Sequence, residues 1–225
     1  WSPDSKHLVF RNTSSELQGP GLYWTRSDGA VPPVRILEGT AWQGRQFSPD
    51  GKRLLYADTS GFGDLWTLPL DAVDSDNPKP GKPELFLRAD RPIRQAAFSP
   101  DGKWVVYSGG QTGAPADVRP FPGPGGVWQI SSGAADEVFW PRNGQVLFNN
   151  RGTIQQVDYT AANGTFSPGP AHPWLEMPRT FQVINGIDIS PDGKRLLVVA
   201  TADERASITG PTHATFLFNF FDELD

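Results

Sequence analysis

Short apolar runs separated by a recurring polar turn organise the whole chain. The turn follows an apolar or aromatic residue and reads Ser-Pro-Asp-Gly-Lys in its full form. Its five copies begin at residues 1, 47, 98, 140 and 189, so their spacings are 46, 51, 42 and 49 residues. A repeat of about 40 to 50 residues is typical of one four-stranded blade in a radial β architecture. The pattern therefore predicts one such blade for each copy of the turn.

The turn sequence has a mechanical reason. Serine at the first position, proline with a preset φ at the second, aspartate at the third and glycine in the left-handed region at the fourth form a type I turn with a following bulge, which reverses a strand. Two copies depart from this form. Ser5 replaces the glycine, at a cost of about 1 kcal/mol if it adopts a positive φ, and Asn143-Gly144 supplies another favourable turn dipeptide. We assign a structural role to the turn residues, which are Asp4, Asp50, Gly51, Asp101, Gly102, Asn143, Gly144, Asp192 and Gly193.

Strands are predicted at regular positions around each turn. We name the strands of one repeat A to D in chain order, with A before the turn and B after it. Apolar runs predict strand B at Leu54–Tyr56, Trp104–Tyr107, Val146–Phe148 and Leu196–Val199. Strand C is predicted at Leu22–Thr25, Leu65–Leu68, Asp117–Phe121 and Ile154–Val157. Strand D is predicted at Val34–Leu37, Glu84–Leu87 and Val127–Ile130.

Four antiparallel strands per repeat, repeated radially, predict an all-β propeller rather than a stacked solenoid, whose repeats are generally shorter. We expect a single domain over residues 1–225 with about five blades, at approximately 1–41, 42–90, 91–135, 136–180 and 181–225. The first repeat has lost most of strand A, and the last has only three plausible strands. Because a closed propeller commonly completes one blade with strands from both termini, we expect an incomplete ring from a propeller of six or more blades, within a larger protein.

Composition agrees with this fold and excludes several functions. The 24 Gly and 22 Pro leave no room for long helices, and eight Trp argue against a disordered chain. The net charge of −5 provides no basic field for nucleic acid. No apolar run approaches the roughly 20 residues of a membrane-spanning helix, so we expect no membrane contact by this segment itself. The chain has no Cys, which excludes disulfides and thiolate metal sites.

No constellation of catalytic residues is found in the sequence. A G-x-S-x-G nucleophile turn, a D-F-G sequence and metal-binding His spacings are missing. The isolated residues His7, His172 and His213 are interpreted as surface or packing residues. The polar loop at residues 71–77 could bind Ca²⁺, but it lacks the glycine and glutamate of an EF-hand loop, so a solvated loop is favoured. We therefore predict no catalytic residue, no metal site and no cofactor.

The repeated turn and the strand after it resemble the blades of TolB-like propellers and of prolyl-oligopeptidase-type peptidases. A second likeness is narrower. Residues 118–131, Val-Arg-Pro-Phe-Pro-Gly-Pro-Gly-Gly-Val-Trp-Gln-Ile-Ser, and the ending at residues 214–224 resemble the C-terminal propellers of bacterial, especially acidobacterial, serine/threonine protein kinases. In that family a cytoplasmic kinase precedes a membrane span and an extracytoplasmic propeller. The resemblance implies an extracytoplasmic sensor, tethered through a membrane span that this sequence does not contain.

A binding face is predicted where the loops that enter strand A and the loops between strands B and C gather around the central channel. Loops carry function when a rigid scaffold positions them, and aromatic and arginine side chains dominate binding hot spots. We expect a protein or small-molecule ligand at this channel face. The candidate residues are Trp42, Gln43, Arg45, Arg91, Arg94, Glu137, Gln182 and Asn185.

Three functions remain open at this point. The first is a non-catalytic propeller scaffold that acts as an extracytoplasmic sensor or interaction domain of a kinase. The second is an accessory propeller of a prolyl-oligopeptidase-like hydrolase, or a TolB-like periplasmic interaction protein. The third is a carbohydrate-cleaving propeller, which predicts glycosidase activity in the isolated chain. The missing catalytic constellation favours the first function.

Overall fold

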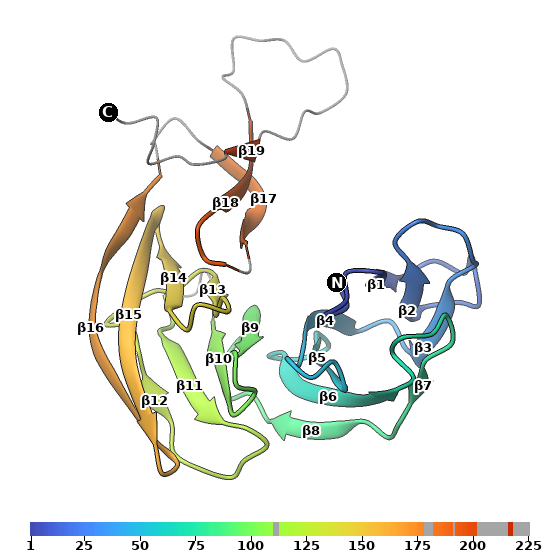
Figure 1. Ribbon diagram of the computed structural model, residues 1–225, viewed down its shortest axis with the longest axis horizontal. Helices are drawn as coiled ribbons and strands as arrows, with labels where there is room; N and C mark the ends of the chain where they lie inside the picture. The colour runs from blue at the N-terminus through green and yellow to red at the C-terminus, as the bar shows by residue number, and fades with distance from the viewer. Residues whose placement is uncertain (110–112, 178–181, 191, 202–215, 218–225) are drawn as a thin grey trace.

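The computed structural model describes residues 1–109, 113–177, 182–190, 192–201 and 216–217, and within these ranges it contains strands and turns but no helix. Five antiparallel sheets follow one another in chain order (Figure 1). Most hydrogen-bonded strand pairs join strands that are consecutive in sequence. Each sheet is therefore a local unit of the chain.

The strands have the following bounds. The first sheet contains β1 (His7–Asn12), β2 (Gly21–Arg26) and β3 (Val34–Glu38). The second contains β4 (Trp42–Phe47), β5 (Arg53–Asp58), β6 (Asp64–Asp71), the short β7 (Lys79–Pro80) and β8 (Glu84–Leu87). The third contains β9 (Gln95–Phe98), β10 (Trp104–Ser108), β11 (Ala116–Pro120) and β12 (Trp128–Gln129). The fourth contains β13 (Val138–Phe139), β14 (Val146–Asn150), β15 (Thr153–Ala162) and β16 (Thr165–Glu176). The fifth contains β17 (Gln182–Ile189), β18 (Leu196–Thr201) and β19 (Phe216–Leu217).

The sheets are arranged as the blades of a propeller. In Figure 1, β4, β9, β13 and β17 lie nearest the middle of the molecule, and β3, β8, β12 and β16 lie on the outside. The predicted all-β propeller of four-stranded antiparallel blades is thus confirmed. Within the described residues, the first blade holds counterparts of strands B to D and the fifth holds counterparts of A to C. A ring of six or more blades stays a prediction.

The predicted B, C and D strands each overlap a strand of the structure. The prediction at residues 127–130 was too long, because only the two residues of β12 pair there. No strand D was predicted for the fourth repeat, where the structure has β16, a strand that contains Pro168, Pro170 and Pro173. Proline cannot donate a ladder hydrogen bond, but β16 is the outer edge strand of its sheet, where one side of the backbone needs no partner.

The hydrophobic core lies between the blades. On β5, Leu54 and Tyr56 pack with residues of the first blade, whereas Leu55 and Ala57 pack with residues of the third. This alternation follows from the period of two in a strand, which turns successive side chains to opposite faces of the sheet. Because neighbouring blades cover both faces, strand B is apolar along its length and does not alternate between apolar and polar residues.

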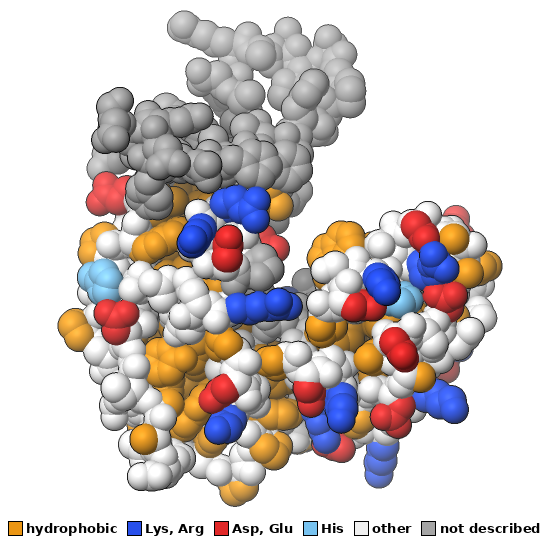
Figure 2. Space-filling model, in the orientation of Figure 1, with side chains coloured by type: hydrophobic (Ala, Val, Ile, Leu, Met, Phe, Trp, Pro, Cys, Tyr) orange, Lys and Arg blue, Asp and Glu red, His pale blue; other side chains and the backbone are white. Residues whose placement is uncertain are grey.

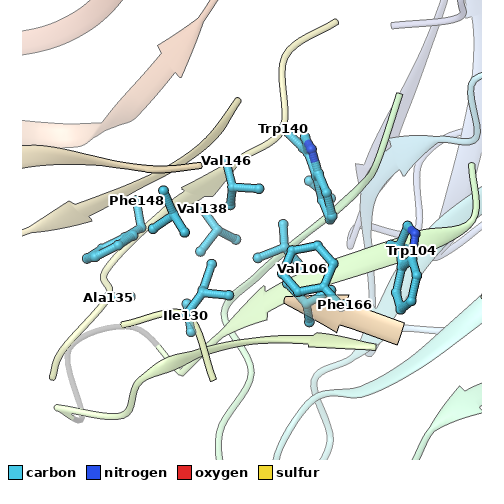
Figure 3. Packing of buried hydrophobic residues seen from close by; sticks show 13 residues of the cluster. Trp104, Val106, Ile130, Ala135, Val138, Trp140, Val146, Phe148 and Phe166 are labelled. Carbon is cyan, nitrogen blue, oxygen red and sulfur yellow. The ribbon is translucent and has the colours of Figure 1, made fainter. Parts of the chain in front are cut away.

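Aromatic side chains fill the interface between the third and fourth blades (Figure 3). Phe166, which is only 1% exposed, comes from β16 of the fourth blade. Its ring centroid lies 5.4 Å from that of Trp104 in the third blade and 6.0 Å from that of Trp140, with the Trp140 ring nearly perpendicular to it. Such aromatic pairs add about 0.5 to 1.5 kcal/mol to the free energy gained by burial. This cluster therefore holds the two blades together.

Replacing Phe166 by Ala tests the importance of this interface. The substitution removes a fully buried ring from contact with both tryptophans, so we expect the free energy of unfolding to fall by about 3 to 5 kcal/mol. Urea denaturation followed by tryptophan fluorescence measures the change. The matched control is Phe62→Ala, because Phe62 is 56% exposed and should change stability by only about 0.5 kcal/mol or less. Equal losses in the two variants would contradict the assignment.

Candidate functional site

The repeated turns share one hydrogen-bond network. In the second blade, Ser48 Oγ donates to Asp50 Oδ1 at 2.6 Å, and the Gly51 amide donates to the Ser48 carbonyl at 2.8 Å. The Arg53 amide on the far side of the turn donates to Ser48 Oγ at 3.0 Å. The serine-to-aspartate hydrogen bond recurs in the turns that contain Asp4, Asp101 and Asp192. One serine and one aspartate thus satisfy the polar groups of each of these four turns.

The fourth turn position has a positive φ in all five copies. The values are 71° at Gly51, 69° at Gly102, 84° at Gly144 and 70° at Gly193, and Ser5 adopts 60° despite its β-carbon. In the degenerate copy, Asn143 Oδ1 takes over the aspartate's role and accepts a hydrogen bond from the Gln145 amide at 3.1 Å. The Gly144 amide closes that turn on the Pro141 carbonyl at 3.1 Å.

Turns of neighbouring blades also lie against one another. A β-carbon added to Gly51 would lie 3.3 Å from Cγ of Pro3, and one added to Gly102 would lie 3.5 Å from Cδ of Pro49. At Gly193, an added β-carbon would collide with the Asn143 side chain at 2.2 Å. The turn residues therefore act within each hairpin and between consecutive hairpins, which is a structural role.

On the candidate binding face, Trp42 is a packing residue. It is partly buried and packs against the apolar cluster between the first two blades. Its Nε1 donates to the Glu38 carbonyl at 2.6 Å, and its ring meets Tyr56 edge to face at 5.5 Å. Gly39 has room only for hydrogen, because a β-carbon there would lie 2.3 Å from Trp42 Nε1. A ligand that reached this face would therefore meet an indole whose N–H is already hydrogen-bonded and whose ring is partly covered by neighbouring side chains.

Arg45 and Arg94 are the candidate residues that the structure brings together. Both belong to the inner region of adjacent blades, since Arg45 lies on β4 and Arg94 directly precedes β9. Gln43, two residues before Arg45, is exposed to solvent. Burial first, and then the positive charge of Arg94, lowers the pKa of Arg45 to about 10. With two guanidinium groups, this part of the face is basic.

Arg91 and Glu137 are held by partners within the propeller. The Arg91 guanidinium forms an ion pair with the buried Asp117 of β11. Glu137 accepts a hydrogen bond from Asn149 Nδ2 at 2.8 Å. The backbones of Gln182 and Asn185 belong to β17, but their side chains lie outside the described residues. Among the described candidates, the structure therefore brings Arg45 and Arg94 near each other and gives Trp42, Arg91 and Glu137 partners within the fold.

Sequence reasoning missed a charged pocket at the junction of the first two blades. The pocket has a volume of roughly 470 Å³ and is lined by Lys6, His7, Arg26, Ser27, Asp28, Asp74, Ser75 and Asp76. His7 stacks on Trp24 at 4.6 Å, and its Nε2 lies 3.4 Å from Asp76 Oδ1. Arg26 pairs with Asp28 and lies 3.8 Å from Asp76. Because opposite charges already face one another here, the loop at residues 71–77 has partners in the first blade.

Across the described ranges, no group of three or more His, Cys, Asp or Glu residues could hold a metal ion. The part of the chain that the structure describes holds no helix with the length and apolar character needed to cross a membrane.

Charged side chains of both signs are scattered over the face seen in Figure 2. In that view a hollow opens between the arm formed by the first blade and the arm formed by the fourth, and a basic side chain lies at its base. The outer rims of the blades show mixed polar and apolar groups.

Comparison with solved structures supports the fold. The chain is similar to a functionally unknown protein from Desulfotomaculum acetoxidans, with 16% identity and a TM-score of 0.57 over 88% of this chain and 63% of that one. It is similar to TolB from Acinetobacter baumannii, with 16% identity and a TM-score of 0.51 over 88% and 47%. A candidate 6-phosphogluconolactonase from Bacteroides uniformis gives 20% identity and a TM-score of 0.50 over 88% and 61%. These likenesses show a shared propeller fold, and the chain spans less than two thirds of each structure.

Sequence comparison does not identify a family for this chain. No protein-family model matches the chain. The chain is 30% identical over 129 residues to the probable beta-galactosidase B of Sclerotinia sclerotiorum, which covers 57% of this chain and only 11% of that protein. The fold and the candidate site therefore define a class, a β-propeller of TolB-like architecture with a basic group at its inner strands.

The turn aspartates make stability depend on pH. Hydrogen bonds from the serine hydroxyl, together with those from the backbone amide, lower the pKa of Asp4, Asp50 and Asp192. A carboxylate whose pKa is lower in the folded state stabilises the fold above its unfolded pKa of about 3.9, and this stability is lost as the pH falls through the folded value. We expect urea midpoints to decrease below about pH 4.

Asp50→Asn isolates one of these contributions. The neutral amide should weaken the acid dependence of the urea midpoint, and its cost at pH 7 should be only about 0.5 kcal/mol because Asp50 is exposed to solvent. Glu16→Gln is the control, since Glu16 is also exposed and lies outside the five turns. An acid limb that is unchanged in Asp50→Asn but weakened in Glu16→Gln would disprove the role given to the turn.

Proposed function

We propose that this propeller is a non-catalytic scaffold that binds a protein or small-molecule ligand at its channel face. The observation that carries the proposal is the pair of arginines in adjacent blades, Arg45 on the inner strand β4 and Arg94 directly before the inner strand β9. No ion pair joins either guanidinium to an acidic side chain of the described residues. Arginines that only stabilise a fold are usually paired when partly buried, as Arg91 is with Asp117. An unpaired basic group near the channel is better suited to an incoming partner.

A sensor role in a bacterial serine/threonine kinase is supported by the sequence likeness of residues 118–131. This segment forms most of β11, the following loop and β12, which are strands C and D of the third blade. A propeller outside the cytoplasm, tethered through a membrane span, would report ligand binding to a kinase domain on the other side. The ligand face and the kinase-like segment lie on different parts of the blade, so the two roles are compatible.

An enzymatic role is the alternative, because two similar proteins carry the names of a lactonase and a galactosidase. The non-enzymatic proposal is supported by the sequence, in which neither a nucleophile turn nor a catalytic histidine arrangement is found. Assays of the isolated chain with 6-phosphogluconolactone and with β-galactosides compare the two roles. Turnover of either substrate above that of a heat-denatured sample would contradict the non-enzymatic role.

The gene around this segment gives the sharpest test of the kinase association. We expect an upstream sequence that encodes a kinase domain followed by one membrane span, since the resemblance places the propeller at the C-terminal end. Sequencing the complete reading frame in both directions measures this directly. A downstream domain with a G-x-S-x-G turn would favour the accessory propeller of a hydrolase instead and would reject the sensor.

The channel face is tested by a pair of variants. We expect Gln43→Ala combined with Arg94→Ala to weaken ligand capture by the immobilised propeller at least tenfold, because both side chains are exposed on this face. Trp42 is left intact because it packs against the apolar cluster between the first two blades. The control is Lys103→Ala, which removes the same charge from an exposed turn. Capture that falls equally in both variants, measured at equal melting temperature, would refute a ligand site at the channel face.

A further inference from the structure

A bulge in the innermost strand of the second blade sets the position of Arg45. Along β4, Gly44 pairs with Tyr56 of β5 and Gln46 pairs with Leu55, so Arg45 has no opposite residue. An extra residue of this kind bends the strand and re-aims its own side chain. Bulges are common beside functional sites for that reason. The bulge therefore separates Arg45 from the regular alternation of the strand.

Arg94 is held next to Arg45 by contacts between the two blades. The Arg94 amide donates to the Ser108 carbonyl at 2.9 Å, which fixes the backbone before β9. Gln46, the residue after Arg45, accepts a hydrogen bond from the Phe98 amide of β9 at 2.7 Å through its side-chain oxygen. This bond ties β4 to β9 directly. Arg45 on β4 and Arg94 directly before β9 thus come from neighbouring blades whose inner strands are hydrogen-bonded to each other.

The charges of the pair are uncompensated. Arg45 is partly buried, and its Nε atom is buried with no hydrogen-bond partner. The nearby charge of Arg94 disfavours the Arg45 cation further. Two positive charges close together in a partly desolvated place oppose folding unless an anion lies between them. The Arg45 cation therefore costs stability where it lies.

The other described arginines differ in whether a carboxylate pairs with them. Five of them form ion pairs with carboxylates, namely Arg26, Arg35, Arg53, Arg88 and Arg91. The chain also has an excess of acidic residues, 25 against 20 basic ones. A carboxylate partner for Arg45 would therefore have been easy to supply. Its absence among the described residues points to an anion that comes from outside.

We propose that Arg45 and Arg94 bind the oxyanion group, a carboxylate or a phosphate, of a ligand at the channel face. This inference rests on the proposed function and adds the chemical class of the ligand. A guanidinium group presents planar N–H donors that match two oxygens of one carboxylate or phosphate. Arg45 would offer its terminal N–H groups, since its Nε atom is buried, and the exposed Arg94 would close on the other side of the anion. Gln43 would add a neutral hydrogen-bonding group nearby.

Titration with two simple anions tests the proposal. Inorganic phosphate and succinate are added separately to the propeller at constant ionic strength, and binding is followed by calorimetry and by the shift in melting temperature. We expect at least one anion to bind and to raise the melting temperature. Arg45→Met and Arg94→Met should each weaken that binding at least tenfold. Binding of phosphate alone identifies a phosphorylated ligand, and binding of succinate alone identifies a carboxylate ligand.

A matched control separates a site from general charge attraction. Arg142 is exposed and lies in the turn of the fourth blade, so Arg142→Met removes the same charge without touching the pair. Anion binding should be unchanged in this variant. Failure of both anions to bind the unaltered chain, or equal weakening in Arg142→Met, would overturn the proposal.

The stability of the variants provides a second readout. Without anion, Arg45→Met should melt at the same or a higher temperature than the unaltered chain, because it removes a buried charge that has no partner. A lower melting temperature in Arg45→Met would mean that the side chain stabilises the fold, and would overturn the proposal. If both anions fail while ligand capture still depends on Gln43 and Arg94, the oxyanion site is refuted and the proposed function stands.

Discussion

Packing between blades is the interaction on which the rest of this structure depends. A blade with a neighbour on each side is apolar on both faces of its sheet. In the second blade, Leu54 packs with residues of the first blade and Leu55 with residues of the third. A single blade in water would leave both of these faces exposed, at a cost of about 25 cal/mol for each Å² of apolar surface. Blades therefore stabilise one another in series, as the units of other repeat proteins do. The rigidity of the channel face follows from these interfaces.

The turns also help to hold neighbouring blades together, but through polar groups and backbone conformation. A serine hydroxyl and an aspartate carboxylate satisfy the polar groups of the reversal, and a residue in the left-handed conformation completes it. Contacts such as that between Gly51 and Pro3 link consecutive turns. Because the turns lie at the opposite end of strand A from the loops that enter it, one end of the propeller carries a fixed sequence and the other is free to vary. Function is thus expected at the variable end.

The arginine pair combines features that lower the stability of the fold, as a ligand-binding site often does. A bulge, a buried donor without a partner and two adjacent like charges each oppose folding, and they occur together at Arg45. Functional sites commonly conflict with stability in this way, because groups prepared for a ligand are not satisfied without it. Trp42, which is close in sequence, shows the opposite behaviour, since its polar and apolar parts are satisfied within the fold.

The sequence by itself determined the architecture. The spacing of the turns, the apolar B strands and the glycines with positive φ are local features, and they predicted the blades and most strands because each blade is formed by consecutive residues. The sequence also limited the candidate binding residues to a small group near the loops that enter strand A. It could not distinguish Trp42, which packs, from Arg45, which has no partner. That distinction depends on interactions between residues far apart in the sequence, such as the charge of Arg94 acting on Arg45 and the ion pair of Arg91 with Asp117. Only the tertiary structure decided these, because the bulge in β4 and the packing of one blade on the next determine which charges meet.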